Sequence, residues 1–492
     1  MIMNVDENLS VANGRDAVST LEFTKDQQRA YDGLIKFINS PYDPDDYKRA
    51  LIGAAGTGKT FLVRTLIKNC NLNYSKIGLG APTHKACRVL AESISIPNIK
   101  TNTLQSDLGL RLNFDIEKFD ISNPPFDPKG KIKILHNRYS LYIVDEASMI
   151  NRSLCMFLER TCKNASCKII YIGDSYQLPP VKETHASAFR NVISYTLNEI
   201  VRQEKDNPII NLLSVLRDDI RHKTYNFLNY ISKNKSQWDE SYIKGYHVCN
   251  PQEFTVNVYN NFRDEQLTVD TNFAKIVAYT NNCVSAWNKF VRNNIISDAD
   301  KAVITKNDLI ISYVTLVDQF NDTIIKNSEE YIVKDIVNYV HPRYNIKGFM
   351  VTFIAIHGGQ RTIPLFVVDH KDMASVQSYL QTSKQLINYA KLARANVRAQ
   401  KWKDYYAFRE SCLLLTNIVS NSGEILYRRD LDYGFALTSH KSQGSTFDTT
   451  FVDVNDIVYD KNGRPYNDAE QTNRRLYVAC SRCRNKLYLK FG

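Results

Sequence analysis

An apolar stretch that runs into a glycine-rich turn constrains this chain more than any other feature. Residues 50–52 (ALI) lead into GAAGTGKT at 53–60, and the amphipathic stretch FLVRTLIK follows. The complete P-loop spacing between a strand and a helix predicts a parallel α/β sheet with a phosphate-binding loop. Glycines let backbone N–H groups face a phosphate at a helix N-terminus, where negative charge is stabilised. A chance glycine-rich turn is the alternative.

The side chains of this loop have distinct predicted roles. Lys59 is expected to reach the β- and γ-phosphates of a nucleotide, and the Thr60 hydroxyl is expected to ligate Mg²⁺. The candidate nucleotide-binding residues of the loop are Gly53, Gly56, Thr57, Gly58, Lys59 and Thr60.

Length and composition set the scale of the protein. Its 492 residues are 43% hydrophobic and 23% charged, so we expect about two to four domains with buried cores. The net charge of +11 fits a polyanionic partner, either nucleic acid or a membrane surface. The sequence has no run of about 18 apolar residues that could cross a membrane, and the start MIMNVDENLS does not resemble a secretory signal.

The cysteines do not predict disulfides or a metal site. Ten cysteines in a chain of this length are too sparse for a disulfide scaffold. Cys480 and Cys483 form a CxxC pair, but no second pair lies at zinc-ligand spacing. We therefore expect reduced thiols in an intracellular protein.

Strand-like segments alternate with amphipathic stretches over residues 20–200, and this order predicts a doubly wound parallel sheet. The strand candidates are Arg49–Ile52, Lys76–Leu79, Leu141–Val144 and Lys168–Ile172. A later set, separated along the chain, predicts a second α/β domain and comprises Ala274–Tyr279, Phe435–Thr438, Thr450–Val454 and Lys486–Lys490.

Two inserts interrupt these domains. Short β-rich runs at 308–317, 330–338, 347–356 and 361–368 predict a small antiparallel barrel. The sequence predicts that residues 371–410 are helical and basic. These helices either brace the barrel or hold the nucleic-acid strand; the alternative is an ordinary solvated helical face with an aromatic core. Residues 104–138, rich in Pro, Gly and Phe, interrupt the first domain as either a wedge or a plain surface loop.

Polar residues follow two strands of the first predicted sheet. Asp145 and Glu146 come directly after Leu141–Val144, at the sheet edge where a P-loop metal lies. Asp145 is predicted to hold Mg²⁺ and Glu146 to polarise an attacking water, whereas a solvated turn is the alternative. Gln177 follows a later strand and suits a sensor of the γ-phosphate; a turn stiffened by Pro179 and Pro180 explains it equally well.

The P-loop, DEAS at 145–148 and GDSYQLPP at 173–180 resemble, in this order and spacing, motifs I, II and III of superfamily 1 helicases. Further segments resemble the Q motif and motifs Ia, Ib, IV, V and VI: LEFTKDQ at 21–27, APTHKA at 81–86, TNTL at 101–104, NEIVRQ at 198–203, LTSHKSQGST at 437–446 and YVACSR at 477–482. The sequence most resembles the phage helicase Dda and its RecD-like relatives, the branch that moves 5′ to 3′.

The resemblance implies two RecA-like parallel-sheet motor domains of the α/β class. A small pin insert is implied in the first motor domain, and an SH3-like β-barrel plus a helical insert in the second. The implied ranges are 20–103 and 139–200 for the first motor domain, 104–138 for the pin, 201–300 and 430–492 for the second motor domain, and 301–429 for its insert.

The resemblance also implies residue roles. Gln27 would read the adenine edge, Gln443 and Gly444 would contact the nucleotide, and Arg202 and Arg482 would act as arginine fingers. A surface ion pair is the alternative for either arginine, and a structural role is the alternative for the two histidines below. The implied nucleic-acid contacts are Pro82, Thr83, His84, Thr101 and Thr103 from one domain and Thr438, His440 and Lys441 from the other.

The implied function is an ATP-dependent DNA helicase that uses ATP and Mg²⁺ and moves 5′ to 3′ on single-stranded DNA. It would unwind duplex DNA in phage-type replication, recombination or repair. Expected partners are single-stranded, duplex and forked DNA and single-strand-binding or replisome proteins, without a membrane. A monomer is expected, in the host-cell cytoplasm if the chain belongs to a phage.

Two alternatives stay open. One is an RNA helicase or a single-strand translocase that displaces bound proteins. The other is a P-loop switch or a structural nucleic-acid-binding protein without productive hydrolysis, against which the presence of Glu146, Gln177, Arg202 and Arg482 argues.

Overall fold

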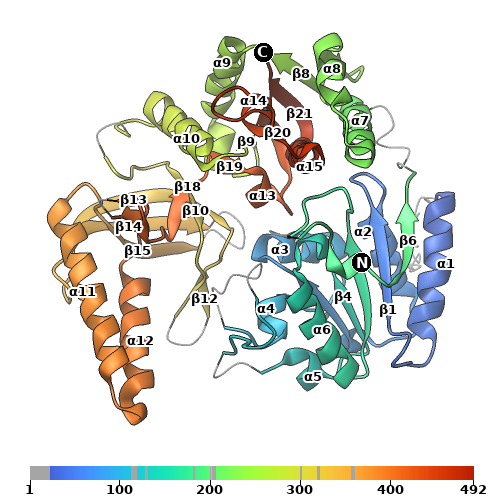
Figure 1. The fold of residues 1–492 in the computed structure, drawn as a ribbon, viewed down its shortest axis with the longest axis horizontal. Coiled ribbons are helices and arrows are strands. Elements are labelled where there is room, and N and C mark those ends of the chain that lie inside the picture. The colour runs from blue at the N-terminus through green and yellow to red at the C-terminus, as the bar shows by residue number, and fades with distance from the viewer. Residues whose placement is uncertain are drawn as a thin grey trace, which may run out of the picture.

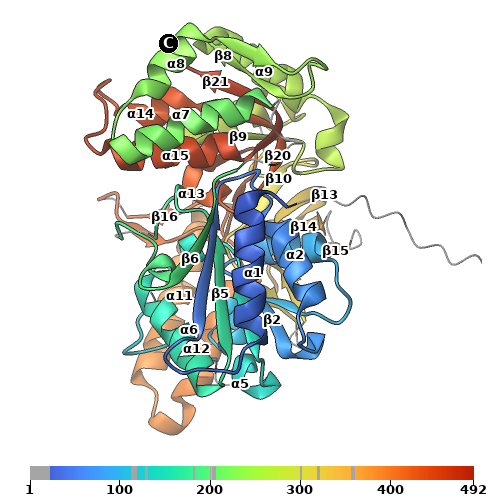
Figure 2. The ribbon, with the colours of Figure 1, turned by 90° about the vertical axis from the view of Figure 1, so that its right-hand side faces the viewer.

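The computed structural model describes residues 23–111, 119–127, 131–180, 183–199, 201, 207–299, 302–318, 322–355, 361–420 and 422–492. Two α/β domains lie one above the other, and a β-rich insert with a long helical hairpin lies beside them (Figures 1 and 2). Within the described residues, none of the helices combines the length and apolarity needed to cross a membrane.

The first α/β domain is built on a parallel sheet with the order β3-β2-β4-β5-β1-β6 among the described strands. Apolar side chains of α1, α2 and α3 pack on one face, and those of α4, α5 and α6 pack on the other. The strands are β1 (Lys48–Gly53), β2 (Ile77–Ala81), β3 (Thr101–Thr103), β4 (Leu141–Val144), β5 (Lys168–Gly173) and β6 (Ile193–Leu197). The helices are α1 (Lys25–Asn39), α2 (Lys59–Asn69), α3 (His84–Ile94), α4 (Leu104–Asp107), α5 (Lys133–Asn137) and α6 (Arg152–Asn164).

The second α/β domain has the strand order β19-β9-β20-β21-β8-β7, parallel except for β7 in the described part of the chain. Helices α7, α8, α14 and α15 cover one face, and α9 and α10 cover the other. Its strands are β7 (Ser236–Trp238), β8 (Gly245–Cys249), β9 (Ala274–Ala278), β19 (Ala436–Thr438), β20 (Phe447–Asp453) and β21 (Cys483–Lys490). Its helices are α7 (Pro208–His222), α8 (Asn226–Lys233), α9 (Pro251–Phe262), α10 (Asn281–Ile295), α13 (Ser439–Ser442), α14 (Val454–Val458) and α15 (Ala469–Ser481).

The insert is an antiparallel sheet with the order β15-β14-β13-β10-β18 over the described residues, together with two small ribbons. A helical hairpin, α11 (Met373–Leu392) and α12 (Ala395–Ser411), extends from this sheet (Figure 1). The sheet strands are β10 (Leu309–Ser312), β13 (Glu330–Val340), β14 (Lys347–Ala355), β15 (Thr362–Val368) and β18 (Leu431–Tyr433). The ribbons are β11 (Leu316–Val317) with β12 (Thr323–Ile325), and β16 (Ile418–Val419) with β17 (Ile425–Tyr427).

The structure confirms two parallel α/β sheets and an antiparallel insert followed by helices. The pin, the SH3-like character of the insert and the implied domain ranges stay predictions. One strand inside the range implied for the second motor domain, β18, pairs with β10 of the insert. In the hairpin, Phe408 is fully buried, but Tyr406 is 47% exposed, so the predicted aromatic core of residues 371–410 is only partly present.

The segment 104–138 contributes to the core of the first α/β domain. Leu104, Leu108, Phe119 and Ile134 are buried in the same apolar cluster as the sheet. Residues 112–118 and 128–130, where a wedge tip was predicted, lie outside the described residues. The wedge therefore stays a prediction.

A buried carboxylate lies where both α/β domains and the insert meet. Glu330 of β13 accepts a hydrogen bond from Lys275 of β9 at 2.8 Å, and Lys85 of α3 lies 3.8 Å from its other oxygen. The exposed fractions of the three side chains are 3%, 0% and 8% in that order. Although burial acts to raise it, the pKa of Glu330 is lowered because the two ammonium groups stabilise the carboxylate.

Replacing Glu330 by Gln is expected to lower the free energy of unfolding by about 3–5 kcal/mol, because it leaves two lysines without a buried counter-charge. Urea unfolding followed by tryptophan fluorescence measures this change. Glu424→Gln, at an exposed position of the insert, is the matched control. Equal urea midpoints for the two variants would contradict the expected cost.

Candidate nucleotide site and adjoining groove

The P-loop adopts the conformation that its glycines predict. Gly56 and Gly58 have φ angles of 79° and 75°, in the left-handed region that glycine enters without strain. Gly58 precedes α2 without a side-chain cap among the described residues, so the first N–H groups of the helix remain available to an anion. Lys59 Nζ donates to the Gly53 and Ala54 carbonyls at 2.7 and 2.9 Å. These two hydrogen bonds keep the ammonium group against the P-loop backbone.

Two further contacts brace the loop. Thr57 Oγ1 donates to the Ala54 carbonyl at 2.8 Å, and Gln27 Nε2 donates to the Thr57 carbonyl at 3.0 Å. Gln27 Oε1 accepts from the Thr24 N–H at 3.0 Å. Because both ends of the Gln27 amide contact the chain, adenine recognition by Gln27 stays a prediction.

The acidic pair lies at the end of β4, as predicted. Asp145 Oδ1 accepts from the Glu146 N–H at 2.9 Å. Glu146 itself has a φ of 50°, a strained value for a residue with a side chain and one that is often found at functional sites. Burial together with the charge of Asp145 raises the pKa of Glu146 to about 7, against the opposing effects of Arg482 and Lys59.

These residues fit a nucleotide with its Mg²⁺. Glu146 Oε2 is buried and has no hydrogen-bond partner among the described groups, so the pocket is incomplete without another donor. Burial also raises the pKa of Asp145, and a bound cation would offset that cost. Thr60, in the first turn of α2, is exposed and supplies a hydroxyl oxygen, a ligand type that Mg²⁺ accepts.

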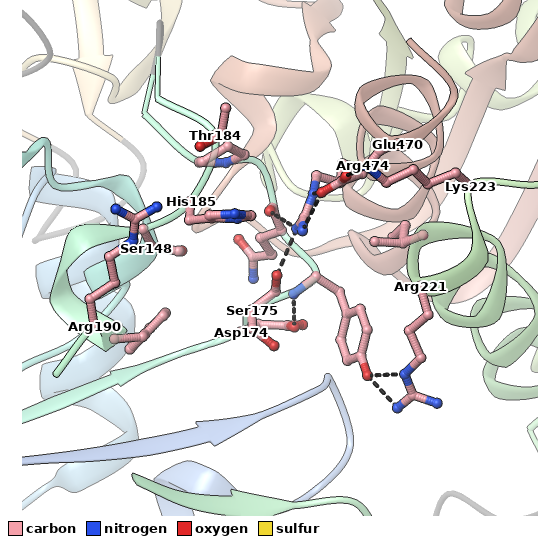
Figure 3. Close-up of a pocket in the computed structure, with 16 residues that line it drawn as sticks. Ser148, Asp174, Ser175, Thr184, His185, Arg190, Arg221, Lys223, Glu470 and Arg474 are labelled. Carbon is pink, nitrogen blue, oxygen red and sulfur yellow. Dashed lines mark hydrogen bonds and ion pairs between the residues drawn. The ribbon is translucent and has the colours of Figure 1, made fainter. Parts of the chain in front are cut away.

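Helix α15 of the second α/β domain holds the motif III loop, residues 174–180, of the first. Arg474 Nη1 donates to the Ser175 and Gln177 carbonyls at 2.6 and 2.9 Å (Figure 3). The same guanidinium donates to the Glu470 carboxylate, which holds it in place. Tyr477 Oη donates to Asp174 Oδ2 at 2.7 Å. Gln177, the predicted sensor, is thus attached through its backbone to the opposite domain.

A pocket of about 540 Å³ lies next to this loop. Arg221 Nε of α7 donates to the Tyr176 hydroxyl at 2.7 Å, and the Tyr176 ring lies 6.0 Å from that of Tyr477. Arg190 and Lys223 also line the pocket (Figure 3). The loop is therefore contacted from both α7 and α15.

Of the two predicted arginine fingers, the described structure includes Arg482 alone. It is 6% exposed at the end of α15, and its charge acts on the pKa of Glu146 in the other domain. Its guanidinium donates to the Val478 and Ser445 carbonyls, both at 3.2 Å. Arg202 lies outside the described residues, so its role stays a prediction.

Gln443 and Gly444 lie at the boundary between the domains. Gln443 Nε2 donates to the Leu178 carbonyl of the motif III loop at 3.2 Å. Gly444, with a φ of 71°, faces Ala86 of α3, and a Cβ added there would lie 3.5 Å from the alanine methyl. Gln443 lines the groove described next, so nucleotide contact by these two residues stays a prediction.

A groove of about 830 Å³ lies between the two α/β domains and borders the motif III loop at Pro179 and Pro180. The structure brings Thr83, Thr438, His440 and Lys441, all predicted nucleic-acid contacts, into its lining. Pro82, His84, Thr101 and Thr103 are not part of that lining. Segments more than 350 residues apart in the sequence therefore meet in one groove.

The threonines of these motifs also cap helices. The Oγ1 atoms of Thr83, Thr103 and Thr438 accept N–H groups at the starts of α3, α4 and α13. The side chains of His84 and His440 are largely buried, and burial lowers the pKa of each to about 4, helped by the charges of Lys326 and Arg475 respectively. Both rings are therefore neutral at pH 7.

Among the groove residues that sequence reasoning missed are Tyr279, Asn281, Gln471 and Arg475. Tyr279 follows β9, and Asn281 begins α10. Gln471 and Arg475 lie on α15, upstream of the motif VI segment. The Arg474-Arg475 pair beside motif VI was the available signal.

Comparisons with known proteins agree with this arrangement. The AAA-domain family matches residues 37–232. An uncharacterised protein, R530, of Acanthamoeba polyphaga mimivirus is 25% identical over 94% of this chain and 99% of its own length. The ATP-dependent DNA helicase PIF1 of Candida albicans is 30% identical over 34% of this chain, but the match covers only 20% of that protein.

The fold also matches a solved structure, that of Bacteroides Pif1 bound to ssDNA. The likeness covers 95% of this chain and 92% of that one, with a TM-score of 0.50 and 17% identity. Specific relatedness to Dda stays a prediction. The motif set, the two joined α/β domains and these matches make the chain similar to superfamily 1 helicases related to Pif1 and RecD.

Proposed function

We propose that this protein is an ATP-dependent DNA helicase that moves 5′ to 3′ along single-stranded DNA and separates duplex ahead of it. One observation carries the proposal. Helix α15 places Arg475 in the groove and Arg474 and Tyr477 on the motif III loop, and the charge of Arg482, directly after its last turn, acts to lower the pKa of Glu146. A change of groove occupancy can thus reach the nucleotide site through one rigid element.

At the nucleotide site, the P-loop N–H groups and Lys59 would bind the phosphates. Thr60 and Asp145 would hold Mg²⁺, which neutralises phosphate charge during phosphoryl transfer. Glu146 would accept a proton from the attacking water, and Gln177 would orient that water near the γ-phosphate. Arg482 would stabilise charge on the transferring group, a role worth about 10³–10⁵ in rate.

In the groove, the contacts suit a strand held through its backbone. Thr83, Thr438 and neutral His440 offer uncharged hydrogen-bonding groups, and Lys441 adds a positive charge. Such groups contact phosphates and sugars without reading bases. Opening and closing of the domains about this groove would then move the grip along the strand.

The finer parts of the proposal rest on the family resemblance. These are the direction of travel, the wedge within 104–138, a role in phage-type DNA metabolism, single-strand-binding or replisome partners, and a monomer. The full-length relative in a giant virus fits the intracellular setting that we propose, in host cytoplasm for a viral chain.

Lys59→Ala is expected to reduce DNA-stimulated ATP hydrolysis by about a hundredfold or more, because it removes the cation that lies on the phosphates. A steady-state phosphate-release assay with and without oligothymidylate measures this loss. Lys68→Ala, an exposed lysine in the last turn of the same helix, should hydrolyse at the unmodified rate. Retained stimulated hydrolysis in Lys59→Ala would falsify the proposed mechanism.

Unwinding of tailed duplexes tests substrate and direction in the same preparation. A DNA duplex with a 5′ tail should be separated, whereas one with a 3′ tail should not. Preference for RNA tails, or translocation without strand separation, would favour the alternative of an RNA helicase or protein-displacing translocase.

The neutral histidines predict how strand affinity responds to pH. His84 and His440 have pKa values of about 4, so neither gains a proton between about pH 8 and about pH 6. A histidine with the ordinary pKa would gain positive charge in that range and tighten binding to a polyanion. Fluorescence anisotropy at constant ionic strength should therefore give a flat profile. Tightening at pH 6 that disappears in His440→Gln would contradict this assignment.

A further inference from the structure

Among the described cations of the groove, Arg475 has an unused donor. Lys85 faces Glu330 at 3.8 Å, and Lys441 Nζ lies 3.1 Å from the centroid of the Tyr313 ring. Arg475 makes no ion pair with a carboxylate in the described parts of the chain, and its buried Nε has no hydrogen-bond partner there. A desolvated donor without an acceptor is costly, so the position favours a ligand that brings one.

Aromatic contacts fix the plane of this guanidinium. Its central carbon lies 3.8 Å from the centroid of the Tyr279 ring and 5.6 Å from that of Tyr466. The two rings pack edge to face, with centroids 5.3 Å apart. Stacking against a ring holds the planar fork in one orientation and reduces the conformational entropy lost when it binds.

The turn that carries Tyr279 is itself anchored. Asp456 of α14 accepts the N–H groups of Tyr279 and Thr280 at 2.7 and 2.8 Å, and the Thr280 hydroxyl at 2.6 Å. The carboxylate of Asp456 is thus engaged by the turn beneath the ring. The Tyr279 ring that contacts Arg475 is therefore held in a fixed position.

The neighbouring groups indicate the chemical class of the ligand. Asn281, Gln471 and His440 line the same groove and are uncharged donors or acceptors. Glu183, the acidic residue of the lining, is occupied by the Arg152 N–H and the Ser187 hydroxyl. A planar cation among neutral polar groups suits a phosphodiester, which accepts paired hydrogen bonds from an arginine.

We propose that Arg475, held between Tyr279 and Tyr466, is a phosphodiester-binding site of the second α/β domain. The site rests on the proposed function, since it takes one backbone phosphate of the strand in the groove. The site adds a charged phosphate contact on α15 to the contacts that motif V implies. Arg475 is next in sequence to Arg474, which binds the motif III loop. A phosphate bound here is therefore gripped by the helix that also holds the nucleotide-sensing loop.

Salt dependence of DNA binding tests the site. Anisotropy titrations of fluorescein-labelled oligothymidylate are made over a series of NaCl concentrations with the unmodified chain and Arg475→Gln. The variant should bind about tenfold more weakly at the lowest salt. The slope of log affinity against log salt should fall by about 0.7, the value for one lost phosphate contact on a single strand. Affinity for a fluorescent ADP should be unchanged.

Two further variants separate this role from a structural one. Arg484→Gln removes a 61%-exposed arginine of the same domain that pairs with Asp448, and it should keep the unmodified slope. Tyr279→Leu keeps the charge of Arg475 but removes the ring that contacts it. This variant should weaken DNA binding by a smaller factor than Arg475→Gln and should keep the unmodified salt slope.

An Arg475→Gln protein with the unmodified slope would overturn the phosphate site, whether or not its affinity falls. A Tyr279→Leu protein that loses the same slope as Arg475→Gln would also overturn it. Failure of the unmodified chain to bind DNA at all would instead contradict the proposed function. The failures of the two proposals are thus distinguishable.

Discussion

The hydrogen bonds between α15 and the motif III loop are the constraint on which the other functional contacts depend. Arg474 holds two carbonyls of the loop, and Tyr477 holds the Asp174 carboxylate, across the boundary between the α/β domains. Gln443 of the groove lining also donates to the Leu178 carbonyl of this loop, which carries Gln177, the predicted sensor. Any relative motion of the domains must therefore move the loop or break these bonds.

The parts of the fold that sequence analysis could predict are those buried on both faces. Strands such as β5, with every residue buried, read as continuous apolar runs. β3, with the sequence TNT, and β6, which exposes most of its residues, lie at the two edges of the first sheet and carry no such run. The three residues of β18 lie within the range implied for the second motor domain, yet β18 pairs with β10 of the insert, and so short a segment does not indicate its partner strand.

At the candidate site, sequence analysis could predict motifs that are contiguous in sequence. It could not predict contacts between residues that only the fold brings together. The P-loop and the Asp145-Glu146 pair each combine ligand types at fixed spacing after a strand, so their chemistry follows from the residues. Arg475 and Tyr279 are ordinary in sequence, and only the packing of α15 against the turn after β9 brings them together. The amide of Gln27 contacts the P-loop backbone, which spacing alone does not indicate.

A double-mutant cycle on Arg474 and Gln177 tests most directly whether α15 acts on the nucleotide site through the motif III loop. The quantity compared is kcat for ATP hydrolysis at saturating single-stranded DNA, in Arg474→Ala, Gln177→Ala and the double variant. If Arg474 acts through the loop that positions Gln177, the double variant should hydrolyse no more slowly than Gln177→Ala alone. Losses that multiply in the double variant would show that the two residues act independently and would contradict the account.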